Sequence, residues 1–400
     1  MPKRRANGEG NIRKRKDGRW EGRYTVGHDP ETGKAIIKNI LGKTQAEVKE
    51  KLKKAIEENV GIDYGRARTY TVGTWLEVWM ENYAKIKLRP STYKTPQGFL
   101  KNHIKPQIGS IPLADLTTLD LQRFYKHLLD GGRVDRIEAK KKPKGLAPKT
   151  GRNIHQMIGS AYNLALEQRL VTKNPTQGCA LPKVKHKEMK TLTADQLSAF
   201  FQEARDSGVY ELYYLDLATG LRRGELLGLK WPDIRFENST ICIDHTLLYL
   251  PNKGLFEDDT KTTGSRRVIK APQSAMLALQ AYQAWQTRQR MQLGSAWGDS
   301  PYVFTTLEGQ TMRPDTLTNW FHSFIQRTDL PPIHLHSLRH TNATLQIANG
   351  VPLTTVAGNL GHADSATTTK IYAHAIQSAA AASAQMMDDL LNPMAGKRRP

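Results

Sequence analysis

Alternating apolar and polar positions open the chain and predict a small sheet followed by one helix. The strand-like runs are residues 11–16, 19–26 and 34–41. Asp17-Gly18 and residues 29–33 are turn signals between them. A helix should follow from Thr44, because Glu47 stands at the position that completes a capping box. Its apolar stripe is Val48, Leu52, Ala55 and Ile56. We therefore expect a first domain over residues 1–62.

From residue 70 to 180 the apolar positions recur every three or four residues, which predicts a helical domain. A first helix carries Val72, Trp75, Leu76, Trp79 and Tyr83. A second helix starts at Ser91 and reaches toward Ile104. We expect a break or a late start at Pro96-Gln97-Gly98, because proline lacks a backbone N–H. The third and fourth helices are expected before Gly131-Gly132 and over residues 148–168.

Residues 180–190 are basic and contain proline, which is typical of an interdomain linker. The last domain, residues 190–400, mixes helices with short strands. Its helices are expected from the cap Thr193 with Gln196, and at residues 213–218, 273–289, 313–327, 337–348 and 353–359. Its strands are expected at residues 239–248, 253–261 and 266–269. The tail over residues 373–391 is rich in alanine and suited to packing on a neighbouring subunit. The fold class is therefore multidomain α+β, with a three-stranded sheet and helix, a helical domain and a mainly α domain containing a small β-sheet.

The charge of the chain is unevenly distributed. The formal net charge is +21, and lysines and arginines outnumber carboxylates by 16 to 10 over residues 1–64 and by 24 to 9 over residues 65–190. Over residues 191–400 both counts are 19. This distribution favours a polyanionic partner held mainly by the N-terminal half. A solubilising surface charge is the alternative. A membrane-surface role is disfavoured, because no long amphipathic helix presents a basic face.

The cellular compartment is constrained by what the sequence lacks. Cys179 and Cys242 are the only cysteines, which argues against a disulfide framework and a zinc site made of cysteines. The sequence contains no run of about 18 apolar residues, so we expect no membrane span. The basic N-terminus has no apolar segment of a secretory signal. We therefore expect a cytoplasmic protein.

Basic and aromatic residues decorate the predicted sheet, a combination that can enter a DNA major groove. They are Arg13, Arg15, Arg19, Trp20, Arg23, Tyr24 and Lys38. Lys140, Lys141 and Lys142 lie in a predicted loop over residues 133–147 and are candidates for phosphate contacts. The alternatives are an ordinary cationic face for the sheet and a merely flexible segment for the loop.

Two motifs of the last domain carry cations suited to phosphate chemistry. TGLRRGE places Arg222 and Glu225 three residues apart at a helix start, where an arginine fixed by a carboxylate can clamp a phosphate. A structural salt bridge is the alternative. Residues 258–270, DDTKTTGSRRVIK, are predicted to form a β-hairpin with Lys261 near its tip. A loop lysine can protonate a leaving oxygen, although a lone exposed lysine is common.

Two further motifs lie nearer the C-terminus. In HSLRH, His336 and Arg339 share a face of a predicted helix. LGH contributes His362, and Tyr372 follows ten residues later. A metal site is disfavoured, because no carboxylate or cysteine pattern accompanies the histidines. The histidines that such a site would use are His334, His336, His340 and His362.

Together these side chains supply the roles of metal-free phosphoryl transfer. Fixed cations stabilise the negative charge that spreads over the non-bridging oxygens. A tyrosine nucleophile makes a covalent intermediate and divides strand exchange into two steps. The nucleotide-binding pattern GxxxxGK[ST] is absent from the sequence, and no cofactor is needed if a phosphotyrosine conserves the bond energy.

The ordered set resembles the tyrosine recombinase (phage integrase) family. TGLRRGE, KTTGSRRVI, HSLRH, LGH and KIYAH match its motifs in order and spacing, within a resemblance that covers about residues 70–380. Residues 11–59 resemble the arm-type DNA-binding domain of integrases from conjugative transposons and Gram-positive phages. The resemblance implies a helical SAM-like core-binding domain over residues 70–180 and a catalytic domain over residues 190–400. Pro96-Gln97-Gly98 departs from the family, which usually keeps that helix continuous.

The resemblance also implies the role of each residue. Tyr372 attacks the scissile phosphate and leaves a 3′-phosphotyrosine and a free 5′-hydroxyl. Arg222 and Arg339 hold the non-bridging oxygens, and Lys261 protonates the leaving oxygen. The remaining implied roles are proton transfer with the tyrosine for His336, a hydrogen bond to the phosphate for His362, and orientation of the site for Glu225.

The function expected is site-specific integration and excision of a mobile genetic element. The implied partners are double-stranded DNA with core and arm attachment sites, three further copies of the chain in a tetramer, and an excisionase or directionality factor. The alternatives are a chromosome-dimer resolvase, a type IB topoisomerase-like enzyme and a DNA-binding regulator that retains the fold. The N-terminal domain disfavours the resolvase, and the complete catalytic set disfavours the regulator.

Overall fold

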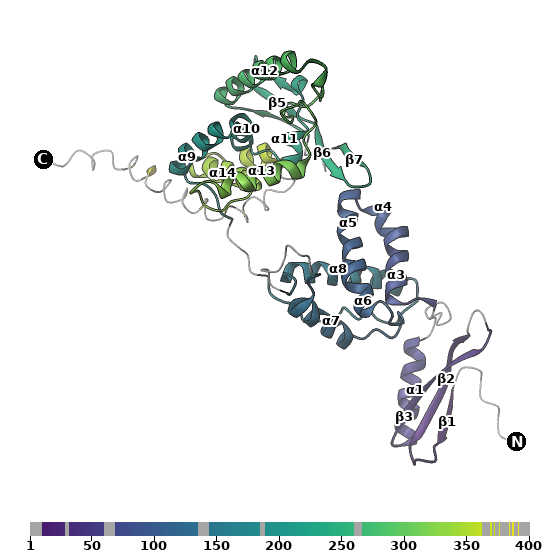
Figure 1. Cartoon of the computed structure of the whole chain (residues 1–400). Helices are drawn as coiled ribbons and strands as arrows, with labels where there is room; N and C mark the ends of the chain where they lie inside the picture. Colours follow the sequence, from purple (N-terminus) through teal and green to yellow (C-terminus); the bar gives the residue numbers. More distant parts are fainter. Residues whose placement is uncertain are drawn as a thin grey trace. The chain divides into compact units, whose positions relative to one another are not determined.

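The computed structural model describes residues 10–28, 32–59, 69–134, 144–184, 189–259 and 266–361, together with residues 369, 372, 376, 384, 386, 387 and 391. The chain separates into two compact units, residues 1–186 and 187–400 (Figure 1). The finer division into three domains stays a prediction. Within the described residues, no helix is long and apolar enough to cross a membrane.

The first unit begins with the predicted sheet and helix. The strands are β1 (Asn11–Lys14), β2 (Trp20–His28) and β3 (Ala35–Gly42), antiparallel in the order β1-β2-β3. Helix α1 (Gln45–Asn59) packs on one face, and the N–H of Glu47 donates to Thr44 Oγ1 at 3.2 Å in its first turn. The packing is close, because a Cβ at Gly22 would lie 2.9 Å from Val48 Cγ1. The predicted sheet and helix are confirmed.

The helical part of the first unit surrounds one hydrophobic cluster. Its elements are α3 (Val72–Trp79), the π-helical turn η1 (Met80–Ala84), α4 (Lys85–Lys87), α5 (Pro90–Phe99), the π-helical turn η2 (Leu100–Ile104), α6 (Lys105–Ile108), α7 (Thr118–Gly131) and α8 (Pro148–Glu167). The large aromatic side chains of the core also satisfy their polar atoms. Trp75 Nε1 donates to Ala161 O at 2.9 Å, and the Tyr162 hydroxyl donates to Leu113 O at 3.0 Å. Burial of each such side chain stabilises the fold by about 2 kcal/mol.

Helix α5 runs through Pro96 without a break, so the predicted interruption was wrong. Pro90 occupies the first turn, and Pro96 removes only one internal backbone hydrogen bond. The chain then continues through η2, where the N–H of Lys105 donates to Leu100 O, five residues back. Leu100 and Ile104 are buried in the helical core. Their burial offsets the lost hydrogen bond and keeps the helix continuous.

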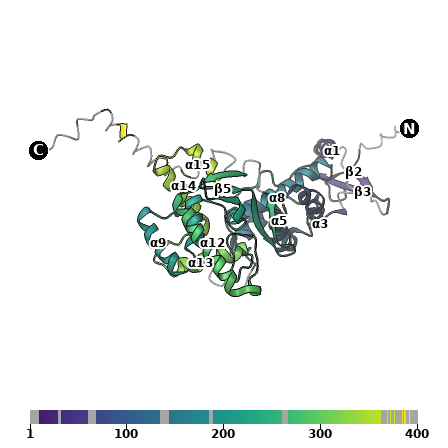
Figure 2. The same cartoon turned by 90° about the horizontal axis from the view of Figure 1, so that it is seen from above.

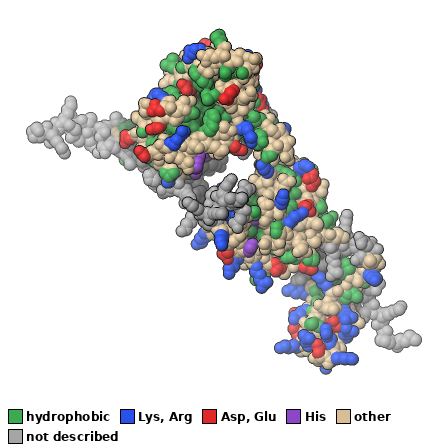
Figure 3. All heavy atoms as spheres, in the orientation of Figure 1, with side chains coloured by type: hydrophobic (Ala, Val, Ile, Leu, Met, Phe, Trp, Pro, Cys, Tyr) green, Lys and Arg blue, Asp and Glu red, His purple; other side chains and the backbone are tan. Residues whose placement is uncertain are grey.

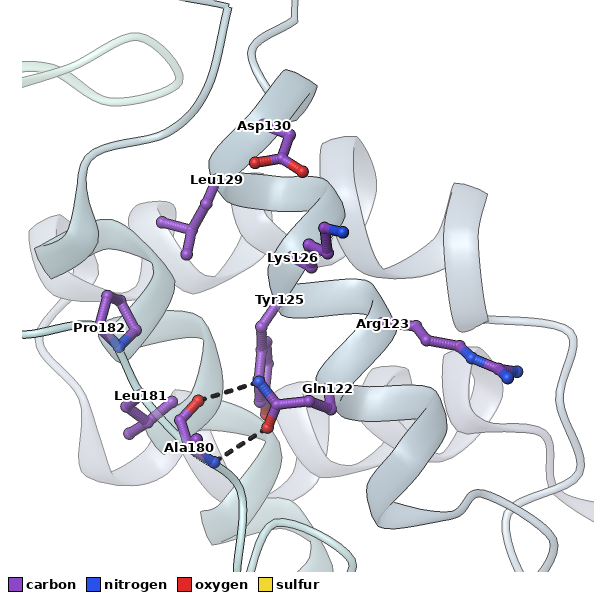
Figure 4. A pocket seen from close by; sticks show the side chains of 9 residues that line it. All are labelled: Gln122, Arg123, Tyr125, Lys126, Leu129, Asp130, Ala180, Leu181 and Pro182. Carbon is purple, nitrogen blue, oxygen red and sulfur yellow. Dashed lines mark hydrogen bonds between the residues drawn. The ribbon is translucent and has the colours of Figure 1, made fainter.

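The segment after α8 docks against α7. Gln122 Nε2 donates to Ala180 O at 3.2 Å, and the N–H of Ala180 donates to Gln122 Oε1 at 2.9 Å (Figure 4). Arg152 Nε donates to Pro182 O at 2.9 Å. A pocket of ≈ 440 Å³ lies between this segment and α7. The predicted linker is therefore fixed to the helical domain at its start.

The second unit contains helices around two small sheets. Its helices are α9 (Ala194–Asp206), α10 (Tyr210–Thr219), α11 (Arg223–Leu227), α12 (Gln273–Leu293), α13 (Pro314–Gln326), α14 (Leu335–Ala348) and α15 (Leu353–Leu360), with 3-10 turns η4 (Trp231–Asp233) and η6 (Gly294–Ala296). Helix α10 packs against α12 and α14. Helix α14 contacts α15 (Figure 2). A capping box joins Thr193 and Gln196 at the start of α9, as predicted. The other predicted helices are confirmed with shifted ends.

The strand predicted over residues 239–248 is two strands of different sheets. The strands are β4 (Ile234–Arg235), β5 (Thr240–Ile243) and β8 (Arg267–Lys270) in one sheet, and β6 (His245–Leu250) and β7 (Gly254–Asp259) in the other. Residues 258–270 therefore do not form the predicted hairpin, because their two strands have different partners. The buried positions Ile241, Ile243 and Leu247 keep the same alternation across the change of sheet. The alternation of apolar and polar residues indicates which side chains are buried, but it does not indicate which strand pairs with which.

Candidate active site

Glu225 forms the centre of an arginine cluster at the start of α11. Its Oε2 accepts from the Arg222 backbone N–H at 3.0 Å, and its Oε1 accepts from Arg222 Nη1 at 2.7 Å. Arg267 of β8 donates to the same carboxylate, with Nη2 at 2.9 Å from Oε2. Glu225 is 3% exposed. Burial raises the pKa of Glu225, but the hydrogen bonds and charges of Arg267 and Arg222 outweigh it and hold that pKa below its usual value.

The C-terminal end of α15 collects three arginines. Three successive carbonyl oxygens each accept one bond: Asn359 O from Arg267 Nε at 2.7 Å, Leu360 O from Arg339 Nη2 at 2.6 Å, and Gly361 O from Arg222 Nη2 at 2.8 Å. Carbonyls of a last helical turn have no partner inside the helix, and the helix dipole is negative there. Gly361 ends the helix at φ 63°, and a Cβ on it would lie 2.9 Å from Arg267 Nη1. The LGH motif therefore ends α15 and fixes the guanidinium groups beside it.

Arg339 is the most deeply buried cation of the described site. It is 2% exposed, and Nη1 donates to Gly220 O at 2.6 Å while Nη2 donates to Leu360 O. Burial, together with the charge of Arg222, lowers the pKa of Arg339 to about 10. The guanidinium thus stays charged at neutral pH. The bonds to the carbonyls of Gly220 and Leu360 fix the position of the whole guanidinium group.

Tyr372 lies in the same buried region and is hydrogen-bonded to α14. Its hydroxyl is 2.8 Å from His340 Nδ1, and the side chains are 3% and 8% exposed. Tyr372 also belongs to a small apolar cluster with Ala343 and Val356. Burial raises the pKa of Tyr372 to about 12, against the charge of Arg339, which lowers it. Tyr372 is therefore a protonated phenol close to a fixed cation.

His336 lies one helical turn before His340. The two imidazole rings meet edge to face, with centroids 4.7 Å apart. Burial, followed by the charges of Arg339 and Arg222, lowers the pKa of His336. Its neutral form is favoured near neutral pH, so it can accept a proton there.

The structure places the predicted residues unequally. Arg222, Glu225, His336, Arg339 and Tyr372 come together in the second unit. Lys261 and His362 lie outside the described residues, as do Lys140, Lys141, Lys142 and most of the predicted Ala-rich tail helix. Within the described part of the chain, no three metal-binding side chains gather into a site.

Three residues of this region have no predicted role in phosphoryl transfer. Arg267 lies inside the KTTGSRRVI motif, where the pattern of the predicted strand did not indicate that an arginine would be buried. His340 stands four residues after His336, a spacing that indicates a shared helix face. Asp216 of α10 is fully buried beside a pocket of ≈ 300 Å³ that His336 also lines. Burial raises the pKa of Asp216 well above its usual value.

The basic residues predicted on the N-terminal sheet divide over its two faces. Arg13 and Arg23 share the open face with Glu21, which is 1% exposed and pairs with Arg13 Nε at 2.7 Å and Arg23 Nε at 3.3 Å. Figure 3 shows lysine and arginine side chains gathered over this part of the chain.

The opposite face of the sheet carries three aromatic and basic residues of the predicted set, whereas Arg15 Nη1 lies 3.7 Å from Glu21 Oε1. Tyr24, which is 7% exposed, lies on the face covered by α1, and the register puts Trp20 and Lys38 on that face with it. The predicted set is therefore divided between the two faces, since residues of opposite parity on a strand point to opposite sides. Their contact with DNA stays a prediction. Arg19 pairs with Asp17 in the turn at 2.7 Å.

Comparisons with known proteins agree with this architecture. The Phage integrase family model matches residues 190–378, and the model of the phage integrase N-terminal SAM-like domain matches residues 71–129. The Tyrosine recombinase XerC-like protein of Caldanaerobacter subterraneus subsp. tengcongensis is 27% identical, over 92% of this chain and 95% of that protein. The ICEBs1 integrase of Bacillus subtilis is 24% identical, over 95% of this chain and all of that protein.

Solved structures share the fold at low sequence identity. The Tn1549 transposon integrase in complex with a circular intermediate DNA has a TM-score of 0.65 at 21% identity, covering 80% of this chain and 99% of that chain. The lambda integrase tetramer bound to a Holliday junction has a TM-score of 0.54 at 19% identity, covering 92% of this chain and 96% of that chain.

The matched family models cover about half of the helical domain and most of the second unit, and the relatives match nearly the whole chain. The chain belongs to the phage integrase family, and it is a tyrosine recombinase that carries out site-specific DNA recombination.

Proposed function

We propose that this recombinase integrates and excises a mobile genetic element, with Tyr372 as its nucleophile. The observation that supports this most is the position of Tyr372, in the same buried region as Arg339. The ICEBs1 integrase, which matches 95% of this chain over its whole length, supports the mobile-element role. In the first step the Tyr372 oxygen attacks the scissile phosphorus, and the 5′-oxygen leaves. A 5′-hydroxyl of the partner strand then attacks the phosphotyrosine and restores the backbone.

The charged side chains have separate roles in this proposal. Arg222 and Arg339 hold the non-bridging oxygens, and their anchoring to carbonyls of α15 and Gly220 keeps them in place as charge develops. Glu225 and Arg267 orient Arg222. Lys261 protonates the leaving 5′-oxygen, and His362 donates to the phosphate. His336 assists proton movement within the site.

The first unit provides most of the binding affinity for DNA. Residues 1–62 contact arm sites through Arg13, Arg15 and Arg23, and residues 70–180 form a core-binding domain with the loop lysines Lys140, Lys141 and Lys142. Four copies of the chain assemble on two duplexes, and the lambda integrase tetramer bound to a Holliday junction supports this number of copies. An excisionase sets the direction, and the reaction takes place on nucleoid DNA in the bacterial cytoplasm.

The nucleophile is tested with a nicked suicide substrate that traps the covalent intermediate. Tyr372→Phe should keep DNA binding and form no protein–DNA adduct. Tyr249→Phe, on the half-buried strand β6, is the matched control and should form adducts at the normal rate. Mass spectrometry of the trapped peptide should find DNA on Tyr372. Adducts that persist in Tyr372→Phe would place the nucleophile elsewhere.

The arm-binding role is tested in the full-length chain. Replacement of Arg13, Arg15 and Arg23 by glutamine should leave cleavage of an isolated core site unchanged and reduce integration between complete attachment sites. Equal integration efficiency in the variant and the wild type would remove the arm-binding assignment.

A further inference from the structure

We propose that His340 is the general base that takes the phenolic proton of Tyr372 during attack on the phosphate. This inference rests on the proposed function, in which Tyr372 is the nucleophile. The observation that carries it is the 2.8 Å contact between His340 Nδ1 and the Tyr372 hydroxyl. In the described residues no hydrogen bond joins His336, the histidine that the family resemblance assigns to proton transfer, to Tyr372.

The buried phenol needs such a partner. With its pKa raised to about 12 by burial, Tyr372 is ionised in only about one molecule in 10⁵ at neutral pH. A positioned imidazole within hydrogen-bond distance can accept the proton as the oxygen attacks. His340 is 8% exposed, so bulk water does not take its place. Arg339, the preceding residue, acts in the same direction, because its charge favours the phenolate.

The geometry also fixes which nitrogen acts. If Nδ1 accepts from Tyr372, the proton of the neutral imidazole is on Nε2. His336 packs against the edge of the His340 ring, with centroids 4.7 Å apart and an interplanar angle of 83°. Helix α14 therefore presents the anchored cation Arg339 and the base His340 at consecutive positions, with His336 beside the base.

In each of the two reaction steps, one bond to phosphorus forms and another breaks. The O–H bond of Tyr372 breaks and its proton moves to His340 Nδ1, while the phenolic oxygen bonds to phosphorus. The bond from phosphorus to the 5′-oxygen breaks, and the leaving oxygen receives a proton from the general acid, which the proposed function assigns to Lys261. In the second step the 5′-hydroxyl attacks, the tyrosine oxygen leaves, and His340 returns the proton to it.

The test separates activation of the nucleophile from protonation of the leaving group. Full-length His340→Asn keeps an oxygen that can accept from Tyr372 near the position of Nδ1, but this oxygen cannot take up the proton. Single-turnover cleavage is measured on an ordinary suicide substrate and on one with a bridging sulfur at the 5′ position, whose thiolate leaves without protonation. His340→Asn should be slower by about 10²–10⁴-fold on both substrates. Lys261→Ala should be slow on the oxygen substrate and recover on the sulfur substrate.

Matched controls keep the outcome decisive. His322→Asn, on the exposed side of α13, should cleave both substrates at the wild-type rate. Cleavage by His340→Asn within about threefold of wild type, or its recovery on the sulfur substrate, would overturn the role of His340 as the base. Adducts in Tyr372→Phe would instead refute the proposed nucleophile, so the two failures are distinguishable.

A second experiment changes the acidity of the Tyr372 phenol, both with and without His340. Incorporation of 3,5-difluorotyrosine at position 372 makes the phenol more acidic. In the wild-type background this should move the pH dependence of cleavage to lower pH, and in His340→Asn, or His340→Gln if the asparagine variant unfolds, it should restore part of the lost rate. A rate that does not respond to the acidity of the phenol in either background would contradict proton transfer from Tyr372 as part of the step.

Discussion

Two clusters of this chain place arginines around a glutamate, and they differ in what surrounds them. On the N-terminal sheet, Glu21 is covered by the side chains of Arg13 and Arg23, which remain 53% and 41% exposed. In the second unit, the side chain of Glu225 is 2% exposed beside that of Arg267, which is 7% exposed. The carboxylate is covered by flexible side chains in the first cluster and by the protein core in the second.

The two clusters show how arginine can serve two purposes, DNA affinity and catalytic rate. Exposed arginines keep their hydration and side-chain freedom, so they suit adjustable and salt-sensitive contacts with phosphates. In the second cluster, main-chain carbonyls hold both Arg222 and Arg267. The side chain of Arg267 is 7% exposed, so the low polarity of its surroundings strengthens its interactions, whereas Arg222 is 38% exposed and open to a phosphate. We infer that the first cluster contributes affinity and the second contributes rate.

The largest effect should come from Arg339→Lys. A lysine keeps the charge but lacks the planar fork whose two nitrogens donate to Gly220 O and Leu360 O. Single-turnover cleavage should fall by about 10³-fold, with the free energy of unfolding lowered by about 2 kcal/mol. Arg288→Lys, on the exposed side of α12, is the control and should change neither. Wild-type cleavage by Arg339→Lys would show that the two anchoring bonds are dispensable.

Glu225→Gln should have the next largest effect. It leaves Arg267 buried without its counter-charge and loosens Arg222. The free energy of unfolding should fall by about 3 kcal/mol, and cleavage should slow by about 10²-fold at saturating DNA. Glu237→Gln removes a carboxylate from an exposed position and should be neutral. If Glu225→Gln were as stable as the wild type and cleaved DNA normally, the Glu225 cluster would contribute to neither stability nor rate.

The stability difference between wild type and Glu225→Gln should depend on pH. The pKa of Glu225 is lower in the folded than in the unfolded chain, so its contribution is complete above the ordinary carboxyl pKa near ~4.3 and is lost as pH falls through the folded value. Urea unfolding should therefore show the difference shrinking below about pH 4.5. A difference that stayed constant would mean that Glu225 is not ionised in the fold.

The smallest effect should come from Glu21→Gln. Its arginine partners are exposed, so the fold tolerates the loss of the carboxylate. Cleavage of a core site should change by less than about twofold, whereas affinity for arm DNA at low salt should rise a few-fold because one negative charge is removed. An isothermal titration series checks this. A loss of cleavage comparable to that of Glu225→Gln would erase the contrast between the clusters.

Much of the site was predictable because its motifs couple local spacing to chemistry. Arg222 and Glu225 are three residues apart at a helix start, and capping geometry alone brings them together. His336 and Arg339 share a helix face for the same kind of reason. Helix periodicity also gave most of the elements, since the burial of one face determines the repeat.

The missed features depend on contacts between distant parts of the chain. Arg267 reaches Glu225 and Asn359 only because β8 pairs with β5, and alternation does not specify a partner. The helix continues through Pro96 because the burial of Leu100 and Ile104 stabilises it by more than one lost hydrogen bond destabilises it. Local helix propensity does not include this tertiary contribution. His340 was named only as a possible metal ligand, because its contact with Tyr372 spans 32 positions.

The separation of affinity from rate is tested most directly by varying salt. DNA affinity and single-turnover cleavage are measured on the same attachment-site DNA between about 50 and 200 mM salt, with the enzyme saturating in the cleavage assay at every point. Affinity should fall by about 10³-fold or more, because many exposed cations contact phosphates, while the saturated cleavage rate stays within about threefold. A saturated rate that fell in parallel with affinity would contradict the account, since the buried arginines would then be as accessible to salt as those on the surface.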